Sequence, residues 1–204
     1  MTAGSGGGVE YVIRDQPQYL YRPGFYIAPG FGGGVIEIVA AGVVTVDGAI
    51  RADGFKGLVS GCAGSAGGSV AIRCAAIEGT GVISADGAVG AHSNGGDYGS
   101  GGAGGGICVT AKRFGGGGGI CVTAKRFGGG GALLANGGNG GTDNRTGGGG
   151  GGRILVARVT DRDNTVTTSV KGGLDSETPV VYPGEDGTVV WQWLPPAGTV
   201  LILR

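Results

Sequence analysis

The chain has 204 residues, 53 of them glycine, and its 15 Lys and Arg residues balance its 15 Asp and Glu residues. No apolar run approaches the roughly 18 residues of a membrane-spanning helix, and no basic patch or aromatic platform suits nucleic acid. Long helices are excluded because each glycine costs a helix about 1 kcal/mol. The chain as a whole lacks a collagen period, which excludes a triple helix. Its positive mean hydropathy of +0.18 argues against disorder throughout.

The first segment, residues 1–31, differs from the rest because it holds many of the aromatic residues and three prolines. One interpretation is a cap on the open end of a repeat array. The other is an interface segment that docks a neighbouring subunit. The candidate interface residues are Tyr11, Tyr19, Tyr21, Phe25 and Tyr26. The N-terminal residues show neither the charged region nor the apolar region of a signal peptide.

The remaining residues, 32–204, repeat one unit that is clearest at 68–87. It contains an expected strand at 70–77, a second at 81–85, and a turn at Asp86-Gly87. The spacing from Val35 to Val70 and from Ile154 to Val189 is 35 residues. Units of this length stack on one another because one unit cannot bury its apolar face alone. The pattern predicts an all-β fold, a parallel β-helix or β-solenoid of about five two-strand rungs.

Gly-rich stretches separate the units, and their lengths suit side loops of a solenoid. The predicted loops are 55–68, 88–106 and 138–153. An alternative is that polyglycine runs as closely packed, extended strands of the polyproline-II type, since no side chains keep the backbones apart. This alternative applies to 101–106, 115–119 and 147–152.

A tandem duplication interrupts the period within 105–129, where the sequence of 105–116 recurs 13 residues later at 118–129. Thirteen residues are too few for another two-strand rung. The extra copy is therefore either looped out beside the ladder or an artefact of the sequence. Cys108 and Cys121 hold equivalent places in the copies. If the copies stack, the two thiols can form a disulfide in an oxidising compartment, and free thiols are equally consistent with the sequence.

The last unit differs from the others, because Trp191 and Trp193 lie on one face of an apolar strand at 188–194. An exposed apolar edge strand readily pairs with another chain. The tryptophans either cover the end of the core or form a subunit interface. Aromatic residues at both ends of the chain favour head-to-tail association, which yields a filament unless rotation closes a ring.

Chemically active motifs are few. His92 is the single histidine, and its Gly-rich surroundings indicate a solvated loop. The Asp161–Asn164 stretch has the alternating oxygens of a calcium loop but lacks its glycine and distal glutamate. Carboxylates also gather in the last loop at Asp175, Glu177, Glu185 and Asp186, without singling out a catalytic pair. We therefore predict no catalytic residue, cofactor or metal ligand, and no enzymatic activity. Asn144 begins a glycosylation sequon.

Four motifs carry a family resemblance: Gly-Gly-Ser-Val-Ala-Ile at 67–72, Gly-Val-Ile-Ser-Ala-Asp-Gly at 81–87, Ala-Asn-Gly-Gly-Asn-Gly-Gly at 135–141, and six glycines before Arg-Ile-Leu-Val at 147–156. Over about residues 32–194 the chain resembles the Gly-rich repeats of large extracellular, adhesin- or fibre-like proteins. The resemblance implies a right-handed parallel β-helix at the cell surface or outside the cell. Weaker resemblances are to Gly-rich tip domains of phage adhesins and to Gly-rich receptor ectodomains.

Together these features predict a structural extracellular protein, a subunit or segment of a filament or surface layer that identical copies assemble end to end. The alternative function is an adhesin that recognises glycans or a host surface through the Gly-rich loops at 88–106 and 138–153. Neither function calls for a nucleic-acid partner or a membrane span.

Overall fold

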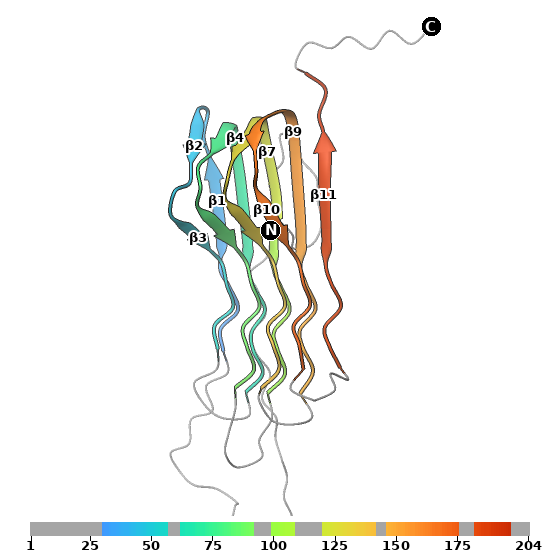
Figure 1. Ribbon diagram of the computed structural model, residues 1–204. Coiled ribbons are helices and arrows are strands. Elements are labelled where there is room, and N and C mark those ends of the chain that lie inside the picture. The colour runs from blue at the N-terminus through green and yellow to red at the C-terminus, as the bar shows by residue number, and fades with distance from the viewer. Residues whose placement is uncertain are drawn as a thin grey trace, which may run out of the picture.

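A computed structural model describes residues 30–56, 62–91, 99–108, 120–141, 146–175 and 182–196. In these ranges all regular structure is β-strand, and every strand pair is parallel. The chain coils so that equivalent strands of successive repeats lie side by side (Figure 1). The predicted all-β, parallel solenoid is therefore confirmed.

Two walls form the coil. The first wall is a seven-stranded sheet of β1 (Val35–Val39), β2 (Val43–Thr45), β4 (Ser69–Glu78), β6 (Gly106–Cys108), β7 (Ile120–Gly129), β9 (Arg153–Asn164) and β11 (Thr188–Trp193). The second wall is a four-stranded sheet of β3 (Ala49–Arg51), β5 (Val82–Ser84), β8 (Ala132–Leu134) and β10 (Thr167–Ser169). The long strands curve over at one end of the molecule and lead into the second wall (Figure 1).

The coil makes about three full turns, slightly fewer than the five rungs predicted. β4 with β5, β6 and β7 with β8, and β9 with β10 form these turns. At the beginning, β1 and β2 share one level, because each pairs with a different half of β4. At the end, β11 pairs with β9, and the described residues include no second-wall strand that follows it.

The hydrophobic core lies between the walls in columns that cross the strands. Val70 and Ile72 of β4 and Ile154 and Val156 of β9 are fully buried. Ile83 of β5 is one of the second-wall residues that complete the cluster. Fully burying such a side chain stabilises the fold by about 1.5–3 kcal/mol. Parallel stacking repeats the alternation of inward and outward side chains at every level, because the pairing is in register.

The Gly-rich stretches form a second packed region, which lies below the strands in Figure 1. The N–H groups of Gly101 and Gly104 donate to the next level of the same wall, and those of Gly102 and Gly105 donate to the opposite wall, at 2.7–2.9 Å. Each kind of bond thus recurs every third residue, the period of polyproline II. Ala103, the third residue of its triplet, is exposed. The region is a bundle of extended glycine segments that bond in two directions.

The predicted Gly-rich side loops are therefore wrong for most of 88–106 and 138–153, and the packed-strand alternative describes 101–105 and 147–152. The physical reason is that glycine backbones approach one another closely enough to satisfy their own hydrogen bonds. Local Gly-Gly-x triplets at 100–105 and 136–141 are the sequence signal of this bundle. The stretch 115–119 lies outside the described residues, as does the cap or interface segment as far as residue 29.

The Asp-Gly and Asn-Gly pairs also differ from prediction, because the chain does not turn at them. Instead their side chains form a ladder across the levels. Asp53 Oδ1 accepts the N–H of Asp86 at 2.9 Å, Asp86 Oδ1 accepts the N–H of Asn136 at 2.6 Å, and Asn136 Oδ1 accepts the N–H of Lys171 at 3.0 Å. Among the glycines that the structure describes, those with positive φ are Gly79 and Gly129, between the two walls.

The ladder leads to a prediction for Asp86. Burial first, and the neighbouring Asp53 carboxylate as well, raise the pKa of Asp86 above its usual 3.8. The folded state therefore holds this proton more tightly than the unfolded state, so the site's stabilisation is present below pH 3.8 and is lost as pH rises through the raised pKa. Asp86→Asn keeps an oxygen for Asn136 and should raise the free energy of unfolding at pH 7, by less than about 1 kcal/mol because the site is half exposed.

Urea unfolding of both proteins between pH 3 and pH 7 checks this expectation, with the stability difference growing as pH rises. Asn136→Asp is the reciprocal variant, since it places a third carboxylate in the ladder and should destabilise the protein at pH 7. Equal stabilities of the wild type and Asp86→Asn across this pH range would contradict the prediction.

Candidate interface at the ends of the solenoid

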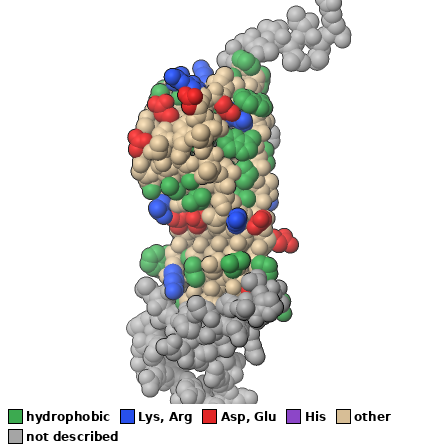
Figure 2. Space-filling view, in the orientation of Figure 1, with side chains coloured by type: hydrophobic (Ala, Val, Ile, Leu, Met, Phe, Trp, Pro, Cys, Tyr) green, Lys and Arg blue, Asp and Glu red, His purple; other side chains and the backbone are tan. Residues whose placement is uncertain are grey.

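Both ends of the first wall are edge strands. β1 and β2 pair only with β4, and β11 pairs only with β9, among the residues that the structure describes. Such edges present unpaired backbone groups to another chain. Large hydrophobic side chains accompany both edges: Phe31, Val35, Val39 and Val43 at the first, and Val190, Trp191 and Trp193 at the last. Figure 2 shows hydrophobic side chains along the margin where β11 lies.

The β11 end holds a compact cation–aromatic cluster. The Arg158 guanidinium lies 4.8 Å from the ring centroid of Trp191 and 4.0 Å from that of Trp193. Arg158 Nε donates to Asp161 Oδ1 at 2.5 Å. Phe127 meets Trp191 edge-on, with the ring centroids 5.6 Å apart. Cation–π contacts of a largely desolvated arginine are worth about 2 kcal/mol.

The strand register explains why this cluster forms where β9 meets β11, the last strand of the first wall. Arg158 pairs with Ala124 and Asp161 pairs with Phe127 of the level before, so an ion pair replaces two apolar core positions. Arg158 is 7% exposed, and its Nη1 atom has no hydrogen-bond partner. The tryptophans of β11 cover this polar pair. Trp193 nevertheless remains 60% exposed, so both interpretations, an end cap and a subunit interface, stay predictions.

The other predicted interface residues, Tyr11, Tyr19, Tyr21, Phe25 and Tyr26, lie outside the described residues. The sequon residue Asn144 and the loop residue His92 lie outside them as well. Their roles stay predictions.

A disulfide between Cys108 and Cys121 was expected if the two copies of the duplication stack as successive rungs. The structure does not place the two cysteines on successive rungs. Both pair with Leu155, so the two copies share one level of the sheet and do not form successive rungs. The chain passes from Ile107, which pairs with Val70, to Cys121, which pairs with Ala71. Residues 109–119 lie outside the described residues, so both interpretations of the duplication and the disulfide stay predictions.

Two of the four acidic residues predicted to gather in the last loop accept backbone hydrogen bonds, and Glu177 lies outside the described residues. Asp175 accepts the N–H of Tyr182, and Asp186 accepts the N–H of Gly172 at 2.8 Å. Asp163 adopts a positive φ of 47° next to the irregularity where β9 passes Gly128 and Gly129. Within the described ranges, no group of three His, Cys, Asp or Glu residues is arranged to hold a metal ion. Burial raises the pKa of the Cys74 thiol to about 11, so it stays protonated at neutral pH.

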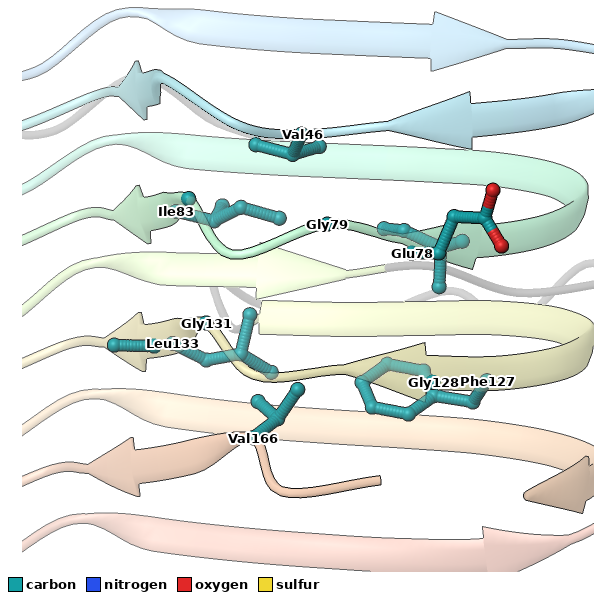
Figure 3. A pocket seen from close by; sticks show the side chains of 12 residues that line it. Val46, Glu78, Gly79, Ile83, Phe127, Gly128, Gly131, Leu133 and Val166 are labelled. Atoms are coloured by element: carbon teal, nitrogen blue, oxygen red, sulfur yellow. The ribbon is translucent and has the colours of Figure 1, made fainter. Parts of the chain in front are cut away.

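Two hollows are notable. Val46, Ile83 and Leu133 line a cavity of about 30 Å³ where the chain passes between the walls (Figure 3), room for about one water molecule. A groove of about 270 Å³ crosses the first wall and includes Arg73 and Lys125 but no carboxylate in its lining. Neither hollow is lined by two carboxylates. Glu78 is the one acidic residue in the lining of the cavity, and the lining of the groove has none.

No helix among the described residues is long and apolar enough to cross a membrane. No protein-family model, no curated protein and no solved structure matches this chain. Its class therefore rests on the fold itself, a Gly-rich parallel β-solenoid with a hydrophobic core and a glycine bundle. The resemblance to adhesin- or fibre-like repeats is supported for this architecture alone.

Proposed function

We propose that the protein is a structural subunit or segment that assembles end to end into an extracellular filament or surface layer. The observation that carries the proposal is the open, hydrophobic edge at each end of one parallel sheet. Because both edge strands run in the same direction, β11 of one copy can pair with β1 of the next in the same parallel sense. Such a contact is heterologous and can repeat without closing.

The core columns support this junction, because they continue across it. Successive pairings link Ile36 of β1 through every level to Val189 of β11, and link Ile38 in the same way to Trp191. A second copy stacked in register therefore places Val189 beside its Ile36 and Trp191 beside its Ile38. This contact buries the inward-facing apolar side chains that are only partly covered in the single chain, among them Ile36, Ile38 and Val189.

The test blocks the free edge of β1 without disturbing its pairing with β4. The N–H of Ala40 donates to Arg73 of β4 at 2.8 Å. In a parallel ladder alternate residues face the same neighbour, so the N–H of Glu37 faces the free edge. Proline at this position removes that donor, and proline is tolerated on edge strands. Glu37→Pro should raise the concentration needed for assembly by about tenfold or more, from loss of about 1.4 kcal/mol or more.

Glu37→Ala is the matched control. It loses the same exposed ion pair with Arg73, at 3.7 Å, but keeps the backbone donor, and it should assemble like the wild type. Electron microscopy of wild-type fibres should show layer lines at about 4.8 Å. A wild-type chain that stays monomeric at high concentration would overturn the proposal. So would equal assembly of the proline and alanine variants.

The extracellular location belongs to the same proposal and is tested by fractionation and by glycosidase treatment for a glycan at Asn144. The alternative function, a glycan- or surface-binding module, relied on long Gly-rich loops. Since 88–91, 99–106, 138–141 and 146–153 are packed in the solenoid, that role would fall to residues 92–98 and 142–145, which lie outside the described residues. Glycan binding by a monomeric chain would favour it over the filament.

A further inference from the structure

One column of glycines crosses every level of the first wall, at the place where the glycine bundle meets the strands. Its members hold equivalent positions in successive levels: Gly34, Gly68, Gly105, Gly152 and Gly187. At each of the last four, a Cβ atom would lie 1.9–2.3 Å from the carbonyl oxygen of the glycine one level before. The fold therefore requires glycine at these four positions, because the backbone of one level passes where a side chain would stand.

Gly34 begins the column and has no such neighbour. A Cβ atom there would have no atom of the described residues within 4 Å, and the φ of Gly34 is not positive. Within the described part of a single chain, neither a close contact nor the backbone conformation requires glycine at this position. A stacked copy supplies the requirement, because the level before Gly34 is then Gly187 of that copy.

The column one residue earlier shows what the chain places where a neighbouring backbone is missing. At Gly151 a Cβ atom would lie 1.9 Å from the carbonyl oxygen of Val170 in the second wall. The equivalent residue one level later is Asp186, and the described residues include no second-wall strand at that level. The Asp186 side chain accepts the N–H of Gly172 at 2.8 Å. This uncovered position of the bundle thus carries a side chain, whereas Gly34 leaves its space open.

The backbone groups at the two edges are complementary as well. Inside the solenoid, the residue after each glycine of the column donates to the glycine one level before, as the N–H of Thr188 donates to Gly152 at 3.0 Å. The counterpart at the first edge is the N–H of Val35. It faces the free edge for the same reason as the N–H of Glu37, since alternate residues of a parallel strand face the same neighbour. The carbonyl of Gly187 in a stacked copy is the matching acceptor.

We propose that the glycine bundle is part of the junction between copies, and that Gly34 admits the carbonyl group of Gly187 of a second copy into the space where a side chain would stand. The inference rests on the proposed end-to-end assembly and adds the bundle edge to the strand contact. Gly34 accordingly serves assembly and not the folding of the single chain.

Gly34→Ala tests the inference, and Gly42→Ala is the matched control. A Cβ atom at Gly42 would also have no described atom within 4 Å, and Gly42 lies at the same edge, between β1 and β2. Its neighbour one level later is Ala75, whose N–H donates to Gly42 at 2.9 Å, so side chains are accommodated in this column. Thermal unfolding of dilute monomer should show both variants as stable as the wild type or slightly more stable.

Only Gly34→Ala should raise the concentration needed for assembly, by about tenfold or more, because the added methyl group separates the two bundle edges and breaks their hydrogen bonds. Electron microscopy over a concentration series measures this change. A wild-type chain that stays monomeric overturns both the filament and this inference. Assembly of Gly34→Ala at the wild-type concentration, or a loss of stability in its monomer, overturns this inference alone and leaves the strand contact standing.

A cysteine pair locates the contact without altering either glycine. Val35 and Thr188 follow Gly34 and Gly187 in the chain, and four strand pairings separate them within one copy. Across the proposed junction they are adjacent. Mild oxidation of the assembled Val35→Cys, Thr188→Cys variant should give disulfide-linked multimers, whereas the wild type and the out-of-register Val35→Cys, Val190→Cys variant should give none. Fibres of the first variant that do not cross-link contradict the inference.

Discussion

Replacing Gly149 with alanine is expected to cost the protein most of its stability, whereas the same change at the adjacent Gly150 should leave it folded. A Cβ atom at Gly149 would lie 2.1 Å from the carbonyl oxygen of Gly102, and backbone cannot move aside as a flexible side chain can. At Gly150 the nearest atom would be 3.8 Å away, an ordinary contact. The two positions differ because Gly149 faces the opposite wall and Gly150 occupies the open place of its triplet.

Neither glycine has a positive φ, so the difference comes from packing alone. Alanine at 149 must separate the walls where Gly149 donates to Gly138 at 2.9 Å and accepts from Gly173 at 2.8 Å. Losing two bonds at about 1 kcal/mol each, with further packing around them, should cost about 3 kcal/mol or more. Gly150→Ala should be neutral or stabilise by about 0.4–1 kcal/mol, because it restricts the unfolded chain.

Urea unfolding followed by circular dichroism compares the two variants, and the free energies are extrapolated to water. Similar losses at both positions would show that the third place of the triplet is not open, and would contradict the bundle geometry.

The second large effect is expected at the ion pair under the tryptophans. Asp161→Asn keeps the shape of the side chain but removes the anion that Arg158 Nε contacts at 2.5 Å. Arg158 is then a buried cation without a counter-charge, which contacts the rings of Trp191 and Trp193 and at most an amide oxygen at position 161. Removing one partner of a buried pair typically costs 3–5 kcal/mol. Since the Asp161 side chain is 31% exposed, we expect about 3 kcal/mol.

The double variant Arg158→Met, Asp161→Leu separates the charge from the packing. It restores apolar character at the two positions where the previous level has Ala124 and Phe127, and it removes the unpartnered Nη1 atom. Replacing a buried pair with apolar residues is often neutral or stabilising. We therefore expect a free energy of unfolding within about 1 kcal/mol of the wild type. A double variant less stable than Asp161→Asn would indicate that the ion pair itself stabilises this end of the solenoid.

Some of the fold could be predicted from short-range patterns. The alternation of Val70 and Ile72 and the spacing of 35 residues between equivalent valines predict parallel strands stacked in register. The strand expected at 70–77 is β4, Ser69–Glu78, and that expected at 81–85 is β5, Val82–Ser84. These predictions succeed because the alternation along a strand and the repeat length both follow from the order of residues along the chain, without knowledge of which segments contact one another.

The wrong predictions concern places where one level contacts another. Asp86-Gly87 has the composition of a turn, yet Asp86 bonds to the level after it, and the positive φ belongs to Gly79. The glycines of 101–105 have the composition of a loop, yet they bond to two neighbouring segments. A local propensity cannot distinguish a glycine that turns the chain from one that must accommodate a neighbouring backbone.

The same distinction holds for the candidate interface. Sequence placed Trp191 and Trp193 on one strand face, but Arg158 lies beneath them only because β9 and β11 pair in a register that puts Arg158 opposite Trp193. By itself, then, the sequence determined the all-β class, the repeat length and the strands, because these follow from periodic side chains. Tertiary structure decided the glycine bundle, the Asp ladder, the shared level of the duplication and the capped ion pair. Each of these depends on contacts between residues that are distant in the sequence, such as Gly102 with Ala88 across the walls and Asn136 with Asp86 across the levels, and these contacts are set when the coil closes on itself.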